Sequence, residues 1–103
     1  MKIRELMAQD KTTLSFEVFP PKKDTDFANV EKAAFGIAQL KPSYMSVTYG
    51  AGGSTKGHTI KLANEIQSKY GVPTIAHLTC VCADKESIKK ALDEMKDAGI
   101  ENI

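Results

Sequence analysis

The chain has 103 residues, which is enough for one small domain. Hydrophobic residues make up 42% and charged residues 26%, and the net charge is +1. This balance gives no electrostatic case for nucleic acid or an anionic membrane surface as partner. The apolar runs are far shorter than a membrane span, and the N-terminus lacks the apolar run of a signal peptide. We therefore expect a cytoplasmic protein that binds neither nucleic acid nor membrane.

The two cysteines, Cys80 and Cys82, form a single C-x-C pair. A zinc site needs more ligands than these two, and no histidine stands nearby at ligand spacing. We expect no metal site, and we expect both thiols to be inert or to pack in the interior.

The pattern of apolar residues predicts alternating helices and strands. A short amphipathic helix comes first, with Ile3, Leu6 and Met7 facing inward. Three short apolar strands are predicted at residues 14–19, 44–49 and 74–80. Helical spacing follows each strand, and the positions that mark it are Phe27, Val30, Ala34, Ile37 and Ala38, then Ile60, Ala63, Ile66, Gln67 and Tyr70, then Ile88, Ala91, Leu92 and Met95.

The ends of the predicted helices carry recognisable signals. Asp84 is placed to cap the third long helix, and Gly71 and Gly99 stand just beyond the second and third. Lys41-Pro42 closes the first long helix.

The strands begin about 30 residues apart, which is the length of a βα unit. The same spacing predicts a fourth strand beginning near Asn102. We interpret residues 1–103 as the N-terminal part of one (β/α)₈ barrel domain of the TIM type, covering three βα units and the start of the fourth strand. An open sheet of three or four strands is the alternative.

The segment Phe16-Glu17-Val18-Phe19-Pro20-Pro21 places a carboxylate in an apolar, aromatic strand. Desolvating a lone carboxylate is costly, so a glutamate kept there is usually neutral, paired or functional. It lies near the end of the strand, where α/β proteins collect their chemistry. If Ser15 and Glu17 face a barrel interior, a partly desolvated Glu17 is suited to act as a general acid. An ion pair with a lysine or arginine from another strand is an equally weighted alternative.

The second strand ends in a polar stripe, Ser46 and Thr48, and then in the glycine-rich segment 50–55. Backbone amides of such a segment can hold an anion or the polar edge of a cofactor. The segment matches neither Gly-x-Gly-x-x-Gly nor a Walker loop, so on its own it indicates a flexible loop.

The third strand carries His77 between apolar neighbours. A hydrogen-bonded core histidine is the commoner explanation, and donation to a ligand carbonyl or phosphate is the other. His58, Lys22 and Lys23 are expected to be solvated.

Three stretches together resemble the methylenetetrahydrofolate reductase family, and they occur in the family's order and spacing. They are Ser15-Phe16-Glu17-Val18-Phe19-Pro20-Pro21-Lys22, Lys41-Pro42-Ser43-Tyr44-Met45-Ser46-Val47-Thr48-Tyr49-Gly50-Ala51-Gly52-Gly53-Ser54-Thr55 and Ala76-His77-Leu78-Thr79-Cys80.

The resemblance implies a flavoprotein oxidoreductase of one-carbon metabolism and methionine biosynthesis. It implies a TIM barrel that binds FAD, takes a hydride from NADH or NADPH, and reduces 5,10-methylenetetrahydrofolate to 5-methyltetrahydrofolate. Glu17 matches the family's general acid. Thr48, Tyr49 and Ala51 match positions lining the flavin and the ring stacked on it, and His77 matches a flavin-contacting histidine.

Two departures from the family pattern limit what this polypeptide is expected to do. The segment 56–59 lacks an arginine that many relatives carry there, and the family's Leu-Arg-Gly-Asp stretch after the fourth strand is absent. We therefore expect that residues 1–103 alone neither bind FAD tightly nor turn over.

Two other readings stay open. One is a non-catalytic half-barrel that self-associates or pairs with a missing C-terminal half. The other is a different barrel enzyme that uses the glycine-rich segment for a phosphorylated substrate. The sequence does not distinguish NADH from NADPH, and it leaves a homo-oligomer open.

Overall fold

A computed structural model describes residues 1–49 and 56–103 and shows an α/β protein built on one parallel sheet. The strands β1 (Ser15–Val18), β2 (Tyr44–Val47) and β3 (Thr74–Ala76) follow one another in chain order. In the register of the sheet, Glu17 lies opposite Ser46, and Ser46 lies opposite Ile75. The three predicted strands are confirmed, although each is shorter than its apolar run.

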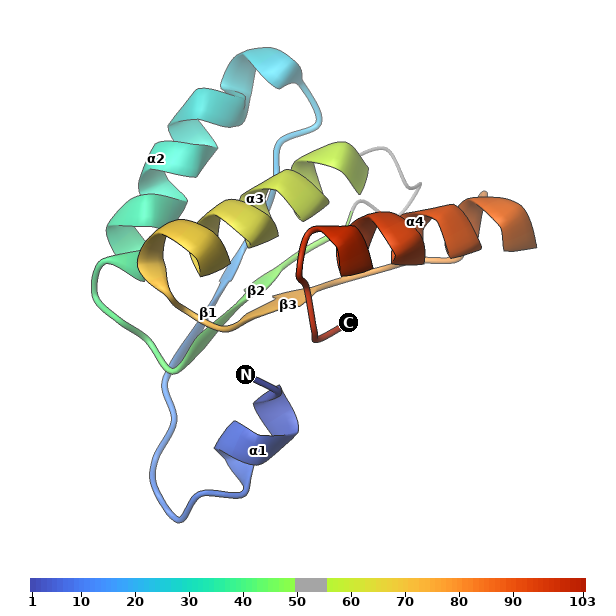
Figure 1. Ribbon diagram of the computed structural model, residues 1–103. Coiled ribbons are helices and arrows are strands. Elements are labelled where there is room, and N and C mark those ends of the chain that lie inside the picture. The colour runs from blue at the N-terminus through green and yellow to red at the C-terminus, as the bar shows by residue number, and fades with distance from the viewer. Residues whose placement is uncertain (50–55) are drawn as a thin grey trace.

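In the described residues, four α-helices accompany the strands: α1 (Ile3–Met7), α2 (Phe27–Ala38), α3 (Lys56–Tyr70) and α4 (Lys85–Asp97). A 3-10 turn, η1 (Asp24–Asp26), leads into α2. Figure 1 shows α2, α3 and α4 in front of the sheet, so the long helices cover the same face. None of the helices in residues 1–49 and 56–103 is both long and apolar enough to cross a membrane.

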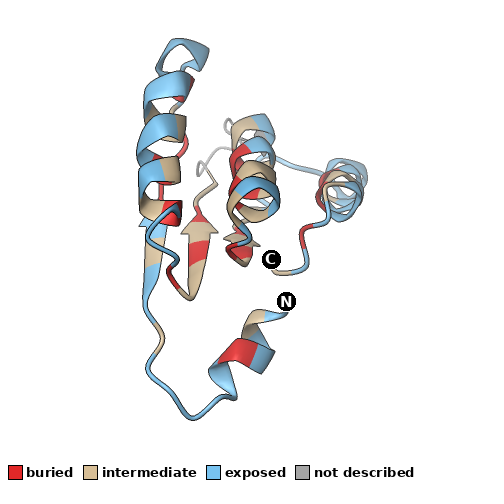
Figure 2. Ribbon diagram, turned by 60° about the vertical axis from the view of Figure 1, so that its left-hand side comes forward, coloured by how far each residue is buried: buried red, intermediate tan, exposed pale blue. Residues whose placement is uncertain are grey.

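The core lies between this helical layer and the sheet. Val18, Met45, Val47, Thr74 and Ala76 are buried, whereas their neighbours along the strands are more accessible. Because side chains alternate between the faces of a strand, this period-two pattern assigns one face to the helices. Figure 2 shows the buried positions gathered where helices meet the sheet. The helices contribute Phe27, Ala34, Ala38, Leu62, Ala63, Ile66 and Met95 to the core.

The helix ends follow the expected chemistry. The Asp84 side chain accepts a hydrogen bond from the Ser87 amide at 2.8 Å and begins α4. Gly71 and Gly99 have φ values of +67° and +74°, a conformation that costs a residue with a Cβ but not glycine. Lys41 adopts a φ of 55° after α2, and its ammonium donates to the Tyr70 carbonyl at the end of α3.

The segment around Asn102 lies beside β3, where the spacing predicts a fourth strand. The Ala76 amide donates to the Asn102 carbonyl at 3.0 Å, and the Asn102 side chain donates to the Thr74 carbonyl at 3.1 Å. The same side chain accepts from the Ile3 amide at 2.9 Å. Asn102 thus continues the sheet hydrogen bonding past β3 and attaches α1 to its edge, although no strand is formed there.

Three apolar positions depart from the sequence prediction. Leu6 is buried, but Met7 is exposed, so the inward face of α1 is narrower than predicted. Leu14 lies outside β1 and is exposed, and Leu92 points from α4 toward solvent. Local spacing overestimates burial in these cases because the helices and strands each contact the core along only part of their length.

The α3 helix provides a direct test of this core. Leu62 is fully buried, so Leu62→Ala is expected to lower the free energy of unfolding by about 2–5 kcal/mol. Leu40→Ala, at a side chain 74% exposed, is the matched control, with an expected change below about 0.5 kcal/mol. Urea denaturation followed by circular dichroism measures both, and equal effects would contradict the assigned core.

Candidate functional site

Two side chains singled out in the sequence meet at the uncovered face of the sheet. The Glu17 Oε2 lies 3.9 Å from the His77 Nε2, across the intervening strand β2. The Ser46 hydroxyl donates to the same carboxylate oxygen at 3.1 Å. Glu17, Ser46 and His77 thus form one polar row across the three strands, which we call the carboxyl–imidazole row.

Backbone hydrogen bonds hold this row in place beyond the regular strands. The Thr48 amide donates to the Val18 carbonyl, and the His77 amide donates to the Val47 carbonyl, both at 3.0 Å. These bonds continue the parallel ladder by one step at its C-terminal edge. The position of His77 relative to Glu17 is therefore set by main-chain pairing and not only by side-chain contact.

Glu17 is expected to be either a partly desolvated general acid or the partner of a lysine or arginine in an ion pair, and its surroundings bear on both. Among the described residues, no lysine or arginine forms a salt bridge with Glu17, and the His77 imidazole lies 3.9 Å from its carboxylate. The Glu17 side chain is 47% exposed, because no described element covers this face. The partial desolvation expected for Glu17 is thus not provided by residues 1–49 and 56–103.

Thr48 and Tyr49 lie at the end of β2 and face different surroundings. The Thr48 carbonyl accepts a hydrogen bond from the buried Thr59 hydroxyl at 2.8 Å. The Tyr49 ring packs against the hydrophobic core. Burial raises the pKa of the Tyr49 phenol, and the negative charge of Glu94 on α4 raises it further.

The other residues considered in the sequence fall into separate groups. Ala51 and the rest of the segment 50–55 lie outside the described residues. Lys22 and Lys23 are exposed, as expected. Cys80 and Cys82 are free and exposed, so they do not pack in the interior, and the alternative that they are inert stays a prediction. Within residues 1–49 and 56–103, no three His, Cys, Asp or Glu side chains are grouped as metal ligands.

His58 corrects another expectation. Its side chain is only 20% exposed, and both ring nitrogens have oxygen partners. Its partners are the Pro21 carbonyl and the Asp24 carboxylate, which follow β1 in the chain. The apolar periodicity of α3 does not indicate that its first turn contacts the chain after β1 and β2, so the sequence predicts no such role for His58 or Thr59.

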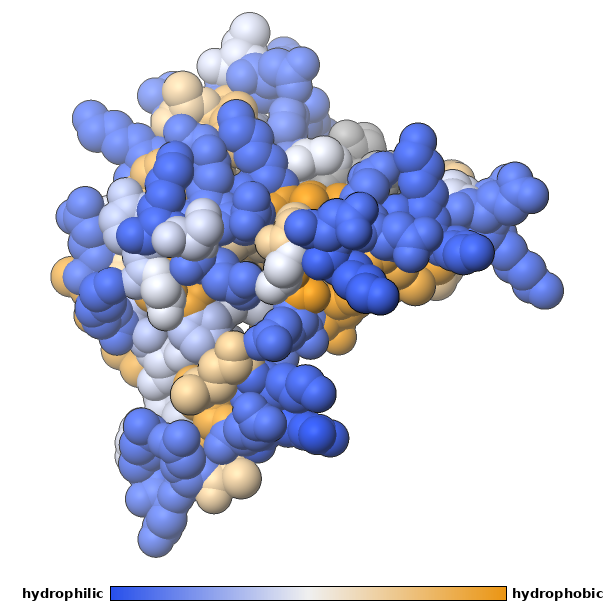
Figure 3. All heavy atoms as spheres, in the orientation of Figure 1, coloured by the Kyte–Doolittle hydropathy of each residue, from blue (hydrophilic) through white to orange (hydrophobic). Residues whose placement is uncertain are grey.

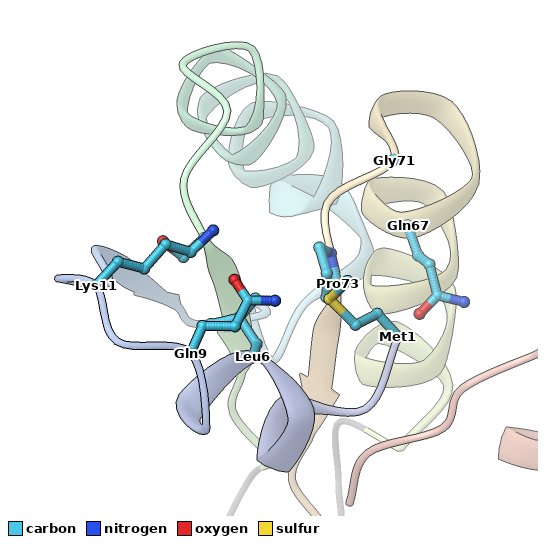
Figure 4. A pocket seen from close by; sticks show the side chains of 8 residues that line it. Met1, Leu6, Gln9, Lys11, Gln67, Gly71 and Pro73 are labelled. Atoms are coloured by element: carbon cyan, nitrogen blue, oxygen red, sulfur yellow. The ribbon is translucent and has the colours of Figure 1, made fainter.

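A pocket of about 370 Å³ lies elsewhere on the molecule (Figure 4). Leu6 of α1 and Pro73, just before β3, are among the residues that line it. It is at the N-terminal edge of the sheet, the edge that parallel α/β proteins use for stability. The outward surface of α4 is covered by hydrophilic side chains (Figure 3). The carboxyl–imidazole row at the C-terminal edge is therefore the better candidate site.

Fold and site together define an α/β protein with a carboxyl–imidazole row where parallel strands end. The family model for methylenetetrahydrofolate reductase matches residues 2–103, and the chain belongs to this family.

Curated relatives agree with this assignment. A "Probable methylenetetrahydrofolate reductase (NADH)" of Oryza sativa subsp. japonica is 38% identical over 99% of this chain and 17% of its own length. A "5,10-methylenetetrahydrofolate reductase" of Buchnera aphidicola subsp. Schizaphis graminum is 39% identical over 91% of this chain and 32% of its own length. "Methylenetetrahydrofolate reductase 2" of Schizosaccharomyces pombe is 39% identical over 86% of this chain and 14% of its own length. The chain therefore spans less than a third of each of these relatives.

The environment of Tyr49 can be tested by titration. Because Glu94 raises the pKa of the Tyr49 phenol, Glu94→Gln should lower that pKa part of the way toward the ordinary value of about 10. The phenol holds its proton more tightly in the folded state, so its contribution to stability is lost as pH rises above the unfolded pKa. Ultraviolet absorbance of tyrosinate measures the pKa, and Tyr49→Phe identifies the signal. An unchanged Tyr49 pKa in Glu94→Gln would show that the ring does not lie beside α4.

Proposed function

We propose that this chain is the N-terminal part of a (β/α)₈ barrel that reduces 5,10-methylenetetrahydrofolate with a flavin. The support for a barrel is the sheet itself: adjacent strands follow in chain order, all are parallel, and the long helices cover one face. A doubly wound sheet places helices on both faces, whereas a barrel reserves the second face for its interior. The carboxyl–imidazole row lies on that second face.

The observation that carries the function is the Glu17–His77 pair at the C-terminal edge, in a chain whose family model matches from residue 2 to residue 103. The Ser46 hydroxyl donates a hydrogen bond to the Glu17 Oε2 and so orients a carboxyl group that can act as a general acid. We assign to Glu17 the proton that opens the five-membered ring of the folate.

The donor set fits a flavin. The polar edge of the flavin ring system needs hydrogen-bond donors and acceptors, and Thr48 and His77 supply a hydroxyl and an imidazole at the strand ends. FAD, when bound, supplies the hydride chemistry. In this proposal Thr48, Tyr49, Ala51 and His77 line the flavin. The Tyr49 ring packs against the hydrophobic core and supports the site from that side. NADH or NADPH is the hydride donor, and the plant relatives are named for NADH.

The uncovered face has a consequence for residues 1–103 taken alone. With Glu17 and His77 both more than 40% exposed, little of a flavin would be enclosed by these residues. A half-barrel that pairs with itself or with a C-terminal half is the competing proposal, supported by the exposed Leu14 and Phe19.

The 103-residue chain is therefore expected to retain no stoichiometric FAD after reconstitution and gel filtration, because too few of its groups surround the ligand. Flavin absorbance of the protein peak measures this. A yellow complex with one FAD per chain would contradict the expectation. The elution volume of the same sample reports self-association, and a monomer at all concentrations would count against the self-pairing form of the half-barrel proposal.

The role of Glu17 is tested in a complete barrel made by joining residues 1–103 to the remainder of the Buchnera reductase. Glu17→Gln keeps the size of the side chain but removes its acid, so folate reduction is expected to fall by roughly 10²–10⁴-fold. Hydride transfer from NADH to the flavin, followed with an artificial electron acceptor, should change little.

Flavin absorbance and circular dichroism establish that the chimera and its variant are equally folded. Equal losses in both half-reactions would contradict an acid role confined to the folate. Absence of folate reduction in a chimera that is folded and loaded with FAD would overturn the proposed function itself.

A further inference from the structure

The first turn of α3 contacts the chain at both of the strand ends next to the carboxyl–imidazole row. Thr59 holds the end of β2 through the Thr48 carbonyl. Its neighbour His58 reaches the loop between β1 and α2, residues 19–26, which we call the β1–α2 loop. This loop begins two residues after Glu17, so whatever fixes the loop also restrains the strand end that carries the acid.

Both ring nitrogens of His58 have an oxygen partner in the β1–α2 loop. The Pro21 carbonyl can only accept, and it lies 2.9 Å from the His58 Nδ1. The Asp24 carboxylate also accepts, and its Oδ1 lies 2.6 Å from the Nε2. Each ring nitrogen of His58 therefore faces an oxygen that can accept a hydrogen bond from it.

Packing holds the imidazole in this position. Its ring lies 4.9 Å from the Phe27 ring, centroid to centroid, at the start of α2. The Lys61 ammonium also lies over the Phe27 ring, 4.5 Å from its centroid. The β1–α2 loop has few internal bonds: the Asp26 amide donates to the Lys23 carbonyl, and the Phe27 amide donates to the Asp24 carbonyl. His58 therefore supplies two connections from this loop to the helical layer.

We propose that His58 is a positioning residue that fixes the β1–α2 loop, and with it the end of the strand carrying Glu17, against the first turn of α3. Its effect on the loop follows from the contacts alone. Its effect on catalysis rests on the function proposed above.

The effect on the loop is tested in the 103-residue chain by amide hydrogen exchange. His58→Phe keeps a ring against Phe27 but removes both hydrogen bonds. Exchange at the amides of Asp26 and Phe27 is expected to accelerate by roughly fivefold to tenfold, because local opening of the loop no longer breaks two bonds. Ser68→Ala, at an exposed position of the same helix, is the control and should leave these rates unchanged.

A second variant distinguishes a local effect of His58 on the β1–α2 loop from a general loss of stability. The Asp24 side chain is 94% exposed, so Asp24→Ala removes one partner of His58 without disturbing the core. It should accelerate loop exchange less than His58→Phe, while exchange in β2 stays the same. Unchanged loop exchange in both variants would overturn the proposal, and so would equal acceleration throughout the chain in both.

The effect on catalysis is tested in the chimera. His58→Phe is expected to lower kcat several-fold per bound flavin, because a mobile strand end spends less time with Glu17 in position. His58→Gln, which can donate one hydrogen bond, should recover part of the rate. A purely structural role would lower the flavin-loaded fraction and leave kcat per flavin unchanged. If wild-type chimera fails to reduce folate, the proposed function falls, whereas the exchange experiment still decides the role of His58 in the loop.

Discussion

The structure depends on one constraint, which is that the parallel strands bury only one face. Met45, Val47 and Ala76 are fully buried against the helices, and side-chain alternation then forces Ser46 and Ile75 to the other side. A shift of one residue in any strand would exchange the two faces and expose the core. The same register that buries the core therefore delivers Glu17, Ser46 and His77 to one surface.

This arrangement explains how a small chain can position the side chains of the proposed site. The row is carried by main-chain ladders that continue through Thr48 and His77, so its geometry is inherited from the sheet. Two consecutive residues of α3, His58 and Thr59, then attach the loops that leave β1 and β2. The helical layer thus holds the chain next to the strand ends, while the strands carry the groups of the carboxyl–imidazole row.

The chain belongs to the methylenetetrahydrofolate reductase family, and this membership supports the role proposed for the carboxyl–imidazole row. Glu17 is half exposed here, and a general acid works best where water is excluded. In the proposed barrel the remaining strands enclose the row and the flavin covers it. The chain would then contribute the acid and one side of the flavin site, and the rest of the barrel would contribute the enclosure.

The sequence by itself determined the elements, because apolar periodicity, the Asp84 cap and the glycines after α3 and α4 are local signals. It also determined the candidates Glu17 and His77, since a charge and an imidazole stand out in apolar strands. Only the tertiary structure decided that they meet across Ser46, that Tyr49 packs beside α4, and that His58 is held instead of solvated. These facts depend on strand order and on contacts between residues about 30 or more positions apart, which no local pattern encodes.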